Sequence, residues 1–331
     1  MLAVSFGSYP RIGDTPGEQT LRRALHAFDR DEIAAEELEA VHRDVVKTVL
    51  REQAEAGLDV VTDGQVTWND PLSHVARGLD GVEINGLLRW FDNNFYYRQP
   101  VLTGPVRWAK PILLEELEFA SAAADRPLKA VLPGPLTFAA MSREGAGPVS
   151  RAGALAVAEA LNRELGSWAE VELAYVQVEE PSFGSDTDRG FLRELYAALL
   201  RDVTLPVIVA PCFRDVSRAW PALFDLPVAG FHLDLRSHAA NASALDGRGL
   251  PEDAAVSLGV LDARNTRRES PAEVAREVER LRTGLASKGP LLLTTSCGLE
   301  FLPRSAARQK LRILAEIRDL VAGTPAAVGA R

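Results

Sequence analysis

Short apolar runs of strand length alternate with amphipathic stretches of helix length along most of the chain. Eight runs rich in valine and leucine predict β-strands. They lie at about 3–6, 58–63, 128–133, 174–179, 205–210, 229–234, 255–260 and 290–295. The stretches between them, such as 273–286 and 305–323, carry apolar residues at helical spacing. Continuous apolar runs are typical of parallel strands covered by helices, and the economical closure of eight such units is a (β/α)8 TIM barrel, an α/β fold.

One long segment interrupts this alternation. Residues 66–108 hold three of the five tryptophans, together with Asn-Gly and Asp-Asn-Asn turn signals. We interpret the segment as an insertion after the second strand, with a β-hairpin as one way to fold it. Its aromatic content argues against disorder, and both a packed cap and a substrate-facing lid fit the pattern. We therefore predict one barrel domain over 1–322 that includes this insertion, followed by a frayed tail at 323–331.

Composition narrows the class of protein further. A net charge of −9 over 331 residues argues against a general nucleic-acid or anionic-membrane binder. No stretch approaches the 18 uninterrupted apolar residues that a transmembrane helix needs. The apolar run at the N-terminus is too short, and carries too little charge, for a signal peptide. We expect a soluble cytoplasmic protein with no membrane partner. In that compartment its two cysteines are thiols or metal ligands rather than a disulfide.

Polar and ionisable residues gather where the predicted strands end. In a barrel of this kind, the chemistry lies in the loops at the carboxyl ends of the strands. The residues at those positions are Ser8, Asp63, Gln65, the turn at 133–135, Glu179, Glu180, Cys212, His232, Asp234, Asp262, Arg264 and Cys297. The two cysteines are far apart in the sequence, but each follows its own strand. We therefore expect them to meet at one edge of the sheet.

Two thiols, an imidazole and a carboxylate at one edge are the ligands of a zinc site. His232 and Asp234 are two residues apart on one strand, so their side chains point the same way. The cysteines carry no CxxC spacing, and a buried cysteine that serves as a small hydrophobic residue is the alternative. Two thiolates and a carboxylate would outweigh the charge of Zn²⁺, which makes a poor site for hydrolysis. Such a metal still deprotonates a bound thiol, so the ligand set favours alkyl transfer to sulfur.

Several motifs resemble those of one known family. They are FGSYPR at 6–11, TDGQVTWND at 62–70, VLPGPLTF at 131–138, VQVEEPSF at 176–183, GVLDAR at 259–264 and TTSCGLEFLPRSAARQKL at 294–311. These motifs resemble the catalytic C-terminal barrel of cobalamin-independent methionine synthase. Full-length members of that family have two barrels, and this chain has the length of one. The chain is therefore similar to the short single-barrel relatives, for which the expected methyl donor is a methylated corrinoid instead of folate polyglutamate.

The resemblance implies a set of metal and catalytic residues. The family's two zinc cysteines fall on Cys212 and Cys297, and its zinc glutamate falls on Asp234. The family's zinc-binding histidine, two residues before the first cysteine, falls on Ala210, whose side chain cannot bind a metal. Three outcomes follow: His232 replaces it from the neighbouring strand, the site keeps three protein ligands plus the substrate, or metal binding is impaired. We favour replacement by His232, and a hydrogen-bonded core histidine is the alternative.

The resemblance also implies how the substrate binds. The backbone N–H groups of Gly7 and Ser8 match the family turn that meets the substrate carboxylate. Glu179 matches the acid that binds the substrate ammonium group, and the second acid falls on Gln65, which has no charge. The family's catalytic histidine falls on Arg264, which stays protonated and cannot shuttle a proton. This agrees with a methylcobalamin donor, whose leaving group needs no proton.

The expected function is therefore a zinc-dependent methyltransferase that converts homocysteine to methionine. Its methyl donor is expected to be methylcobalamin or a corrinoid protein. Two alternatives stay open. One is alkylation of another small thiol such as coenzyme M, because Gln65 stands where the family has an acid. The other is a degenerate barrel that binds an amino acid or a corrinoid protein without catalysis, because Ala210 lacks a ligand atom.

Overall fold

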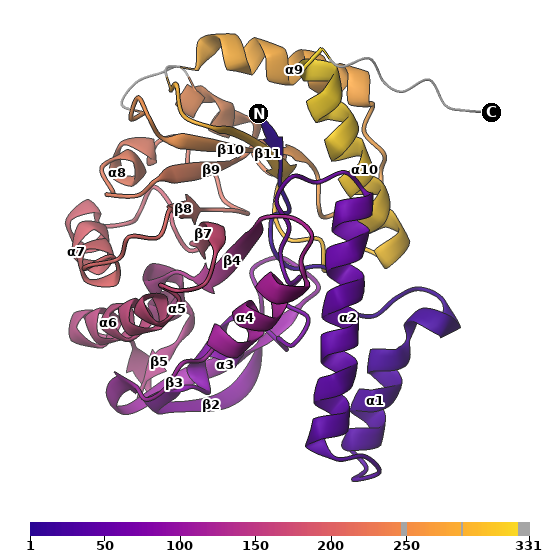
Figure 1. Cartoon of the computed structure of the whole chain (residues 1–331). Helices are drawn as coiled ribbons and strands as arrows, with labels where there is room; N and C mark the ends of the chain where they lie inside the picture. Colours follow the sequence, from indigo (N-terminus) through magenta and orange to yellow (C-terminus); the bar gives the residue numbers. More distant parts are fainter. Residues whose placement is uncertain (246–249, 286, 324–331) are drawn as a thin grey trace.

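A computed structural model describes residues 1–245, 250–285 and 287–323 of the chain. In these residues, seven parallel strands form one curled sheet (Figure 1). The strand order is β1 (Leu2–Ala3), β11 (Leu291–Thr295), β10 (Ala255–Leu261), β9 (Gly230–Asp234), β8 (Val207–Ala210), β7 (Leu173–Glu179) and β4 (Leu128–Pro133). The central strands are buried on both faces, as their apolar runs predict. The expected α/β fold with a parallel sheet is confirmed.

Residues 59–61 lie between the two edge strands of this sheet. The parallel bridges Val4–Val60 and Val61–Leu128 join them to β1 and β4 respectively. Asp59 N donates to the carbonyl of Ala3 at 2.8 Å, and Val61 N donates to the carbonyl of Pro127 at 3.0 Å. The strand expected at 58–63 is therefore reduced to two isolated bridges, which hydrogen-bond to both edges.

A buried glutamine explains why this second strand is so short. Gln53 lies on α2 (Ala35–Glu55), and its side-chain amide bonds both backbone groups of Thr62. Its Nε2 donates to the carbonyl of Thr62 at 2.7 Å, and the backbone N–H of Thr62 donates to its Oε1 at 3.0 Å. The hydroxyl of Thr62 donates to the carbonyl of Gly7 at 2.7 Å. These bonds occupy the groups that would otherwise extend the ladder, so the backbone turns away after Val61.

Most of the helices cover the outer face of the sheet, whereas the helix at 20–28 packs on the helix that follows it (Figure 1). They are amphipathic, and several begin at a side-chain cap or a proline, as helix starts usually do; Asp188 Oδ1, for example, accepts from Phe191 N at 2.7 Å. Their bounds are η1 (Pro16–Glu18), α1 (Thr20–Phe28), α2 (Ala35–Glu55), α4 (Leu114–Ala123), α5 (Pro135–Met141), α6 (Arg151–Ser167), α7 (Arg189–Leu199), α8 (Trp220–Phe224), η2 (Ala239–Leu245), α9 (Pro271–Gly284) and α10 (Arg304–Val321).

The segment 66–108 folds outside the parallel sheet. It contains α3 (Pro71–Ala76) and an antiparallel hairpin of β2 (Leu79–Arg89) and β3 (Tyr96–Trp108). The short strands β5 (Arg143–Glu144) and β6 (Gly147–Pro148) extend the hairpin into a second sheet. Buried Glu164 on α6 holds the base of the hairpin. Its carboxylate accepts a hydrogen bond from Trp108 Nε1 at 2.7 Å, and it accepts from the backbone N–H groups of Ile112 and Leu113, just after the hairpin, at 2.8 Å each. A hairpin is therefore the form that this segment takes.

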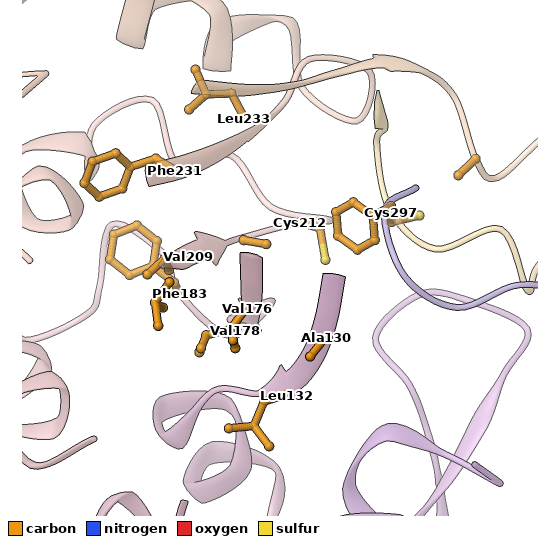
Figure 2. Close-up of a cluster of buried hydrophobic side chains, with 14 of the residues drawn as sticks. Ala130, Leu132, Val176, Val178, Phe183, Val209, Cys212, Phe231, Leu233 and Cys297 are labelled. Atoms are coloured by element: carbon orange, nitrogen blue, oxygen red, sulfur yellow. The ribbon is translucent and has the colours of Figure 1, made fainter. Parts of the chain in front are cut away.

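The core has two parts. A small cluster inside the curl joins Val4, Val60, Ile208, Ala255 and Leu292, which come from strands spread around the sheet. A large cluster between the sheet and its helices contains both cysteines and is shown in part in Figure 2. In the described part of the chain, no helix is long and apolar enough to span a membrane. The tail expected at 323–331 lies outside the described residues, apart from its first residue.

Candidate active site

The register of the parallel strands brings the expected site residues to one edge of the sheet. Glu179 ends β7 and pairs with Ala210, which ends β8. Asp234 ends β9 and pairs with Gly259 on β10. Cys212 and Cys297 each lie two residues beyond the last residue of β8 and β11. The strand ends thus gather the residues that the sequence pattern selected.

Both cysteines are free and almost fully buried at this edge. Burial raises the pKa of the Cys212 thiol well above its usual value, and the negative charges of Glu179, Cys297 and Asp234 raise it further. The pKa of Cys297 is raised by burial first and then by neighbouring acids. The two thiols therefore lie within electrostatic reach of each other and of the same carboxylates, and without a cation they stay protonated.

Asp234 ties the loop after β8 to the end of β9. Its Oδ1 accepts from the backbone N–H groups of Arg236 at 3.0 Å and Ser237 at 2.9 Å, and its Oδ2 accepts from Phe213 N at 3.3 Å. The last of these bonds fixes the residue next to Cys212. In the described residues, no three histidine, cysteine or acidic side chains form a ready metal cluster.

His232 lies deeper than Asp234 on the same strand and is completely buried. Its Nδ1 lies 3.2 Å from Ser257 Oγ and its Nε2 lies 3.3 Å from the carbonyl oxygen of Ser296. Phe6 packs edge-on against the ring, with 4.9 Å between the two ring centroids. Burial lowers the pKa of His232 to about 3, so the imidazole is neutral. These contacts favour the core-histidine alternative.

The expected substrate-binding residues come together. A Cβ placed on Gly7 would lie 3.2 Å from Glu179 Oε1 and 3.7 Å from Gln65 Oε1, so both side chains approach this backbone closely. Gln177 Nε2 donates to Glu179 Oε1 at 3.0 Å and accepts, through its own oxygen, from Lys129 Nζ at 2.6 Å. Burial, and then the charge of Glu300, raise the pKa of Glu179 to about 7.

Glu300 belongs to the same group of residues, although the sequence pattern did not single it out. Its carboxylate accepts a hydrogen bond from Ser8 Oγ, and the backbone of Gly298 passes directly beside both. Burial raises the pKa of Glu300 to about 7. Its place in the motif CGLEFLP, three residues after Cys297, is the only signal that points to it.

A cavity of about 260 Å³ opens beside these residues. The residues that line it include Ser8, Arg11, Gln65, Trp68, Phe95 and Glu300. Gln65 is buried, its backbone has a φ of 52°, and its Nε2 has no hydrogen-bond partner within the described chain. A buried donor without a partner is costly, so the Gln65 amide is a candidate hydrogen-bond donor beside this cavity.

The tip of the β2–β3 hairpin lies over this edge of the sheet. Phe91 contacts Phe213, the residue after Cys212, with ring centroids 5.6 Å apart, and Phe95 contacts Phe301 at 5.9 Å. Phe91 and Phe213 both have positive φ, at 50° and 69°, which is uncommon for bulky residues. Arg264 stacks on Phe213 and forms an ion pair of 2.8 Å with Asp92 in the hairpin tip.

Other strand-end residues serve local structure instead. Glu180 accepts from Thr137 N at 2.7 Å and so anchors the start of α5. Asp262 Oδ1 accepts from the backbone N–H of Arg264 at 2.8 Å. Asp63 lines a separate cavity of about 180 Å³ beside α2 and α4. These three acids do not join the group around Glu179.

Comparison with known proteins identifies the family. The family model described as "Cobalamin-independent synthase, N-terminal domain" matches residues 69–286. A methionine synthase of Sulfolobus acidocaldarius is 29% identical over 91% of this chain and 88% of its own length. A 5-methyltetrahydropteroyltriglutamate–homocysteine methyltransferase of Burkholderia thailandensis is 30% identical over 97% of this chain, which spans only 48% of that relative.

Solved structures agree on the fold. A B12-independent methionine synthase from Shewanella sp. W3-18-1, in complex with selenomethionine, aligns with a TM-score of 0.80 over 98% of each chain at 20% identity. A second structure, from Listeria monocytogenes, aligns with a TM-score of 0.71 over 97% of this chain. The matching family model describes the N-terminal domain, whereas the sequence motifs resemble the catalytic barrel; both lead to the same family. The chain belongs to the cobalamin-independent methionine synthase family.

Proposed function

We propose that this chain transfers a methyl group to the thiol of homocysteine and so makes methionine. The observation that carries the proposal is the gathering of Cys212, Cys297 and Asp234 at the edge of the sheet where Gly7 and Glu179 also meet. Sulfur ligands suit thiol alkylation, and the acid suits an amino-acid substrate. The names of the archaeal and bacterial relatives support the same reaction.

We propose zinc as the resident metal, held by Cys212, Asp234 and Cys297. The donor types fit, because two sulfurs and a carboxylate are common zinc ligands. Burial and the negative charge of Asp234 raise the pKa of both thiols, and a cation between the three groups would offset this effect. As they lie, they form no ready cluster, so we expect metal binding to draw the three side chains together. When bound, zinc would lower the pKa of an incoming thiol.

Of the four expected metal ligands, His232 is the one that the geometry supports least. Both of its ring nitrogens already approach polar atoms of Ser257 and Ser296. We therefore propose the three-ligand alternative, in which the substrate thiol takes the fourth position of a tetrahedral site. In this proposal, alanine at position 210 leaves the fourth coordination position of the metal open to the sulfur of the substrate.

The amino-acid part of the substrate is proposed to bind beside this metal site. Within the described chain, the backbone N–H groups of Gly7 and Ser8 form no hydrogen bond, so they are free to receive a carboxylate. Glu179 offers a carboxylate to the α-ammonium group, and Gln65 Oε1 lies on the same side of Gly7. Together they would fix the substrate so that its thiol points toward Cys212 and Cys297.

The proposed donor is methylcobalamin or a methylated corrinoid protein. Arg264 stands where a proton-transferring group would serve a folate donor, and it is occupied by its ion pair with Asp92. We propose that the hairpin tip around Phe91 is a lid over the site, because it contacts the residue next to Cys212. A bulky corrinoid would then require the lid to move.

The finer fold and location are also proposals. The bridges on both sides of residues 60–61 support a closed (β/α)8 barrel over 1–322, with 66–108 as an insertion. Two buried free thiols suit a reducing compartment, and we propose the cytoplasm.

A second candidate is a barrel that binds an amino acid or a corrinoid protein without catalysis. Two observations favour it: the matching family model is that of the N-terminal domain, and Ala210 removes a metal ligand. Methylation of another thiol, such as coenzyme M, is favoured only by Gln65.

Metal analysis separates these functions. Wild-type protein purified without added zinc should hold about one zinc per chain, as expected for a single tetrahedral site, and Cys212→Ser or Cys297→Ser should lose it. His42→Ala, which removes an imidazole on α2, should keep the metal and serves as the control. Folded wild-type protein that binds homocysteine but never zinc would favour the non-catalytic barrel.

A further inference from the structure

Two carboxylates from different strand ends share one small region of the site. Glu179 ends β7 and lies against Gly7, and Glu300 follows β11 and accepts from the hydroxyl of Ser8. Their proximity is also electrostatic, since the charge of Glu300 acts on Glu179. Within the described residues, neither forms a salt bridge with a lysine or arginine; Lys129 bonds Gln177 instead. Two acids side by side, neither of them in a salt bridge within the described residues, leave a place for a cationic group.

A buried donor without a partner lies beside the same region. Gln65 is only 7% exposed, lines the cavity with Ser8 and Glu300, and has no partner for Nε2 in the described chain. Its Oε1 lies on the other side of the amide, toward Gly7. The cavity wall therefore offers the Glu300 carboxylate for a cation, the Glu179 carboxylate lies beside it against Gly7, and the amide of Gln65 is an N–H donor for an anion. An α-amino acid carries both charged groups on one carbon atom.

We propose that Glu300 is a specificity-determining residue, which joins Glu179 in binding the α-ammonium group of the substrate while Gln65 Nε2 donates to the substrate carboxylate. This inference rests on the proposed function and defines its substrate as an α-amino acid. Position 65 supplies an amide where the family has a second acid. The second negative charge comes instead from Glu300, on the loop after β11. The amide at 65 is then suited to the carboxylate end of the substrate.

The hydrogen bond from the Ser8 hydroxyl orients the Glu300 carboxylate. The bond fixes one oxygen of the carboxylate and leaves the other for the ligand. Gly298 makes this possible, because any side chain there would collide with both Ser8 Oγ and Glu300 Oε2. Glu300 and Ser8 thus form one rigid wall of the cavity, and Glu179 with Gly7 lies beside it.

Calorimetric titration with L-homocysteine and with its des-amino analogue, 4-mercaptobutanoate, tests this inference. The wild-type protein should prefer homocysteine by roughly 10–100-fold, the value of a hydrogen-bonded charge. Glu300→Gln keeps the size and the Ser8 contact but removes the charge, so the preference should fall by about tenfold or more. Affinity for 4-mercaptobutanoate should not fall. Glu277→Gln, at an ion pair with Arg236 outside the cavity, is the matched control and should behave like wild type.

A variant at Gln65 provides a second test that does not depend on Glu300→Gln folding well. Gln65→Glu removes the N–H donor and places a negative charge against the substrate carboxylate, so it should weaken the binding of both homocysteine and 4-mercaptobutanoate. An undiminished preference for homocysteine in Glu300→Gln would overturn the role of Glu300, and unchanged affinity for both compounds in Gln65→Glu would overturn the role of Gln65. Wild-type protein that binds neither thiol would instead contradict the proposed function itself.

Discussion

Replacement of His232 by alanine separates a core role of this residue from a metal-binding role. The imidazole is completely buried, approaches Ser257 and Ser296 with its two nitrogens, and packs against Phe6. Two hydrogen bonds contribute about 0.5–1.5 kcal/mol each, and the lost ring leaves a cavity that costs a further amount. We expect the free energy of unfolding to fall by about 2–4 kcal/mol.

Zinc affinity should respond very differently. Loss of a partner that merely supports a zinc ligand costs roughly 10–100-fold in affinity, and loss of a direct ligand costs at least as much. If the metal is held by Cys212, Asp234 and Cys297, then His232→Ala should change zinc affinity by less than about tenfold.

Two measurements on the same variant decide the matter. Urea unfolding gives the change in stability, and competition with a chelator of known affinity gives the change in zinc binding. Ser257→Ala is the matched control, because it removes one hydrogen bond and leaves the imidazole in place; it should lose about 1 kcal/mol. A large drop in zinc affinity with near-normal stability would refute the core role and restore His232 as a ligand.

Three further predictions follow from the fold and the site. Glu179→Ala should weaken homocysteine binding by about 1–3 kcal/mol and leave 4-mercaptobutanoate unaffected, and equal losses for both compounds would contradict ammonium recognition. Glu164→Ala leaves four buried or half-buried donors unpaired, two of them indoles, and should cost about 3–5 kcal/mol in urea unfolding. Glu164→Gln should cost less, and a loss below about 1 kcal/mol in both would disprove the anchoring role. Arg264→Ala should speed amide hydrogen exchange in the hairpin tip by up to about fivefold, because its partner Asp92 is mostly exposed; unchanged exchange would argue against a lid held by this pair.

The sequence predicted the parallel strands well because their apolar runs are buried on both faces and end at polar residues. It overestimated the second strand, since the pattern of 58–63 does not reveal that the Gln53 side chain takes both backbone groups of Thr62. A side chain from the preceding helix, only nine residues earlier in the chain, ended that strand. The pattern of apolar and polar positions does not show which side chain will bond to the backbone.

The candidate site was predictable to the extent that strand ends define it. Cys212, Asp234 and Glu179 follow directly from where the apolar runs stop. The depth of His232 was harder to judge, because alternation fixes the face of a strand but not the level at which a neighbour's backbone closes over it. Glu300 was missed because it lies in a loop whose path depends on Gly298, where a side chain would collide with Ser8.

Methionine formation tests the central claim most directly. Zinc-loaded protein is incubated with L-homocysteine and either methylcobalamin or methyl-folate polyglutamate, and methionine is measured by mass spectrometry. We expect methionine from wild-type protein with methylcobalamin, little with the folate, and none above background with Cys297→Ser. Wild-type protein that binds zinc and homocysteine yet forms no methionine with either donor or with a methylated corrinoid protein would contradict the account.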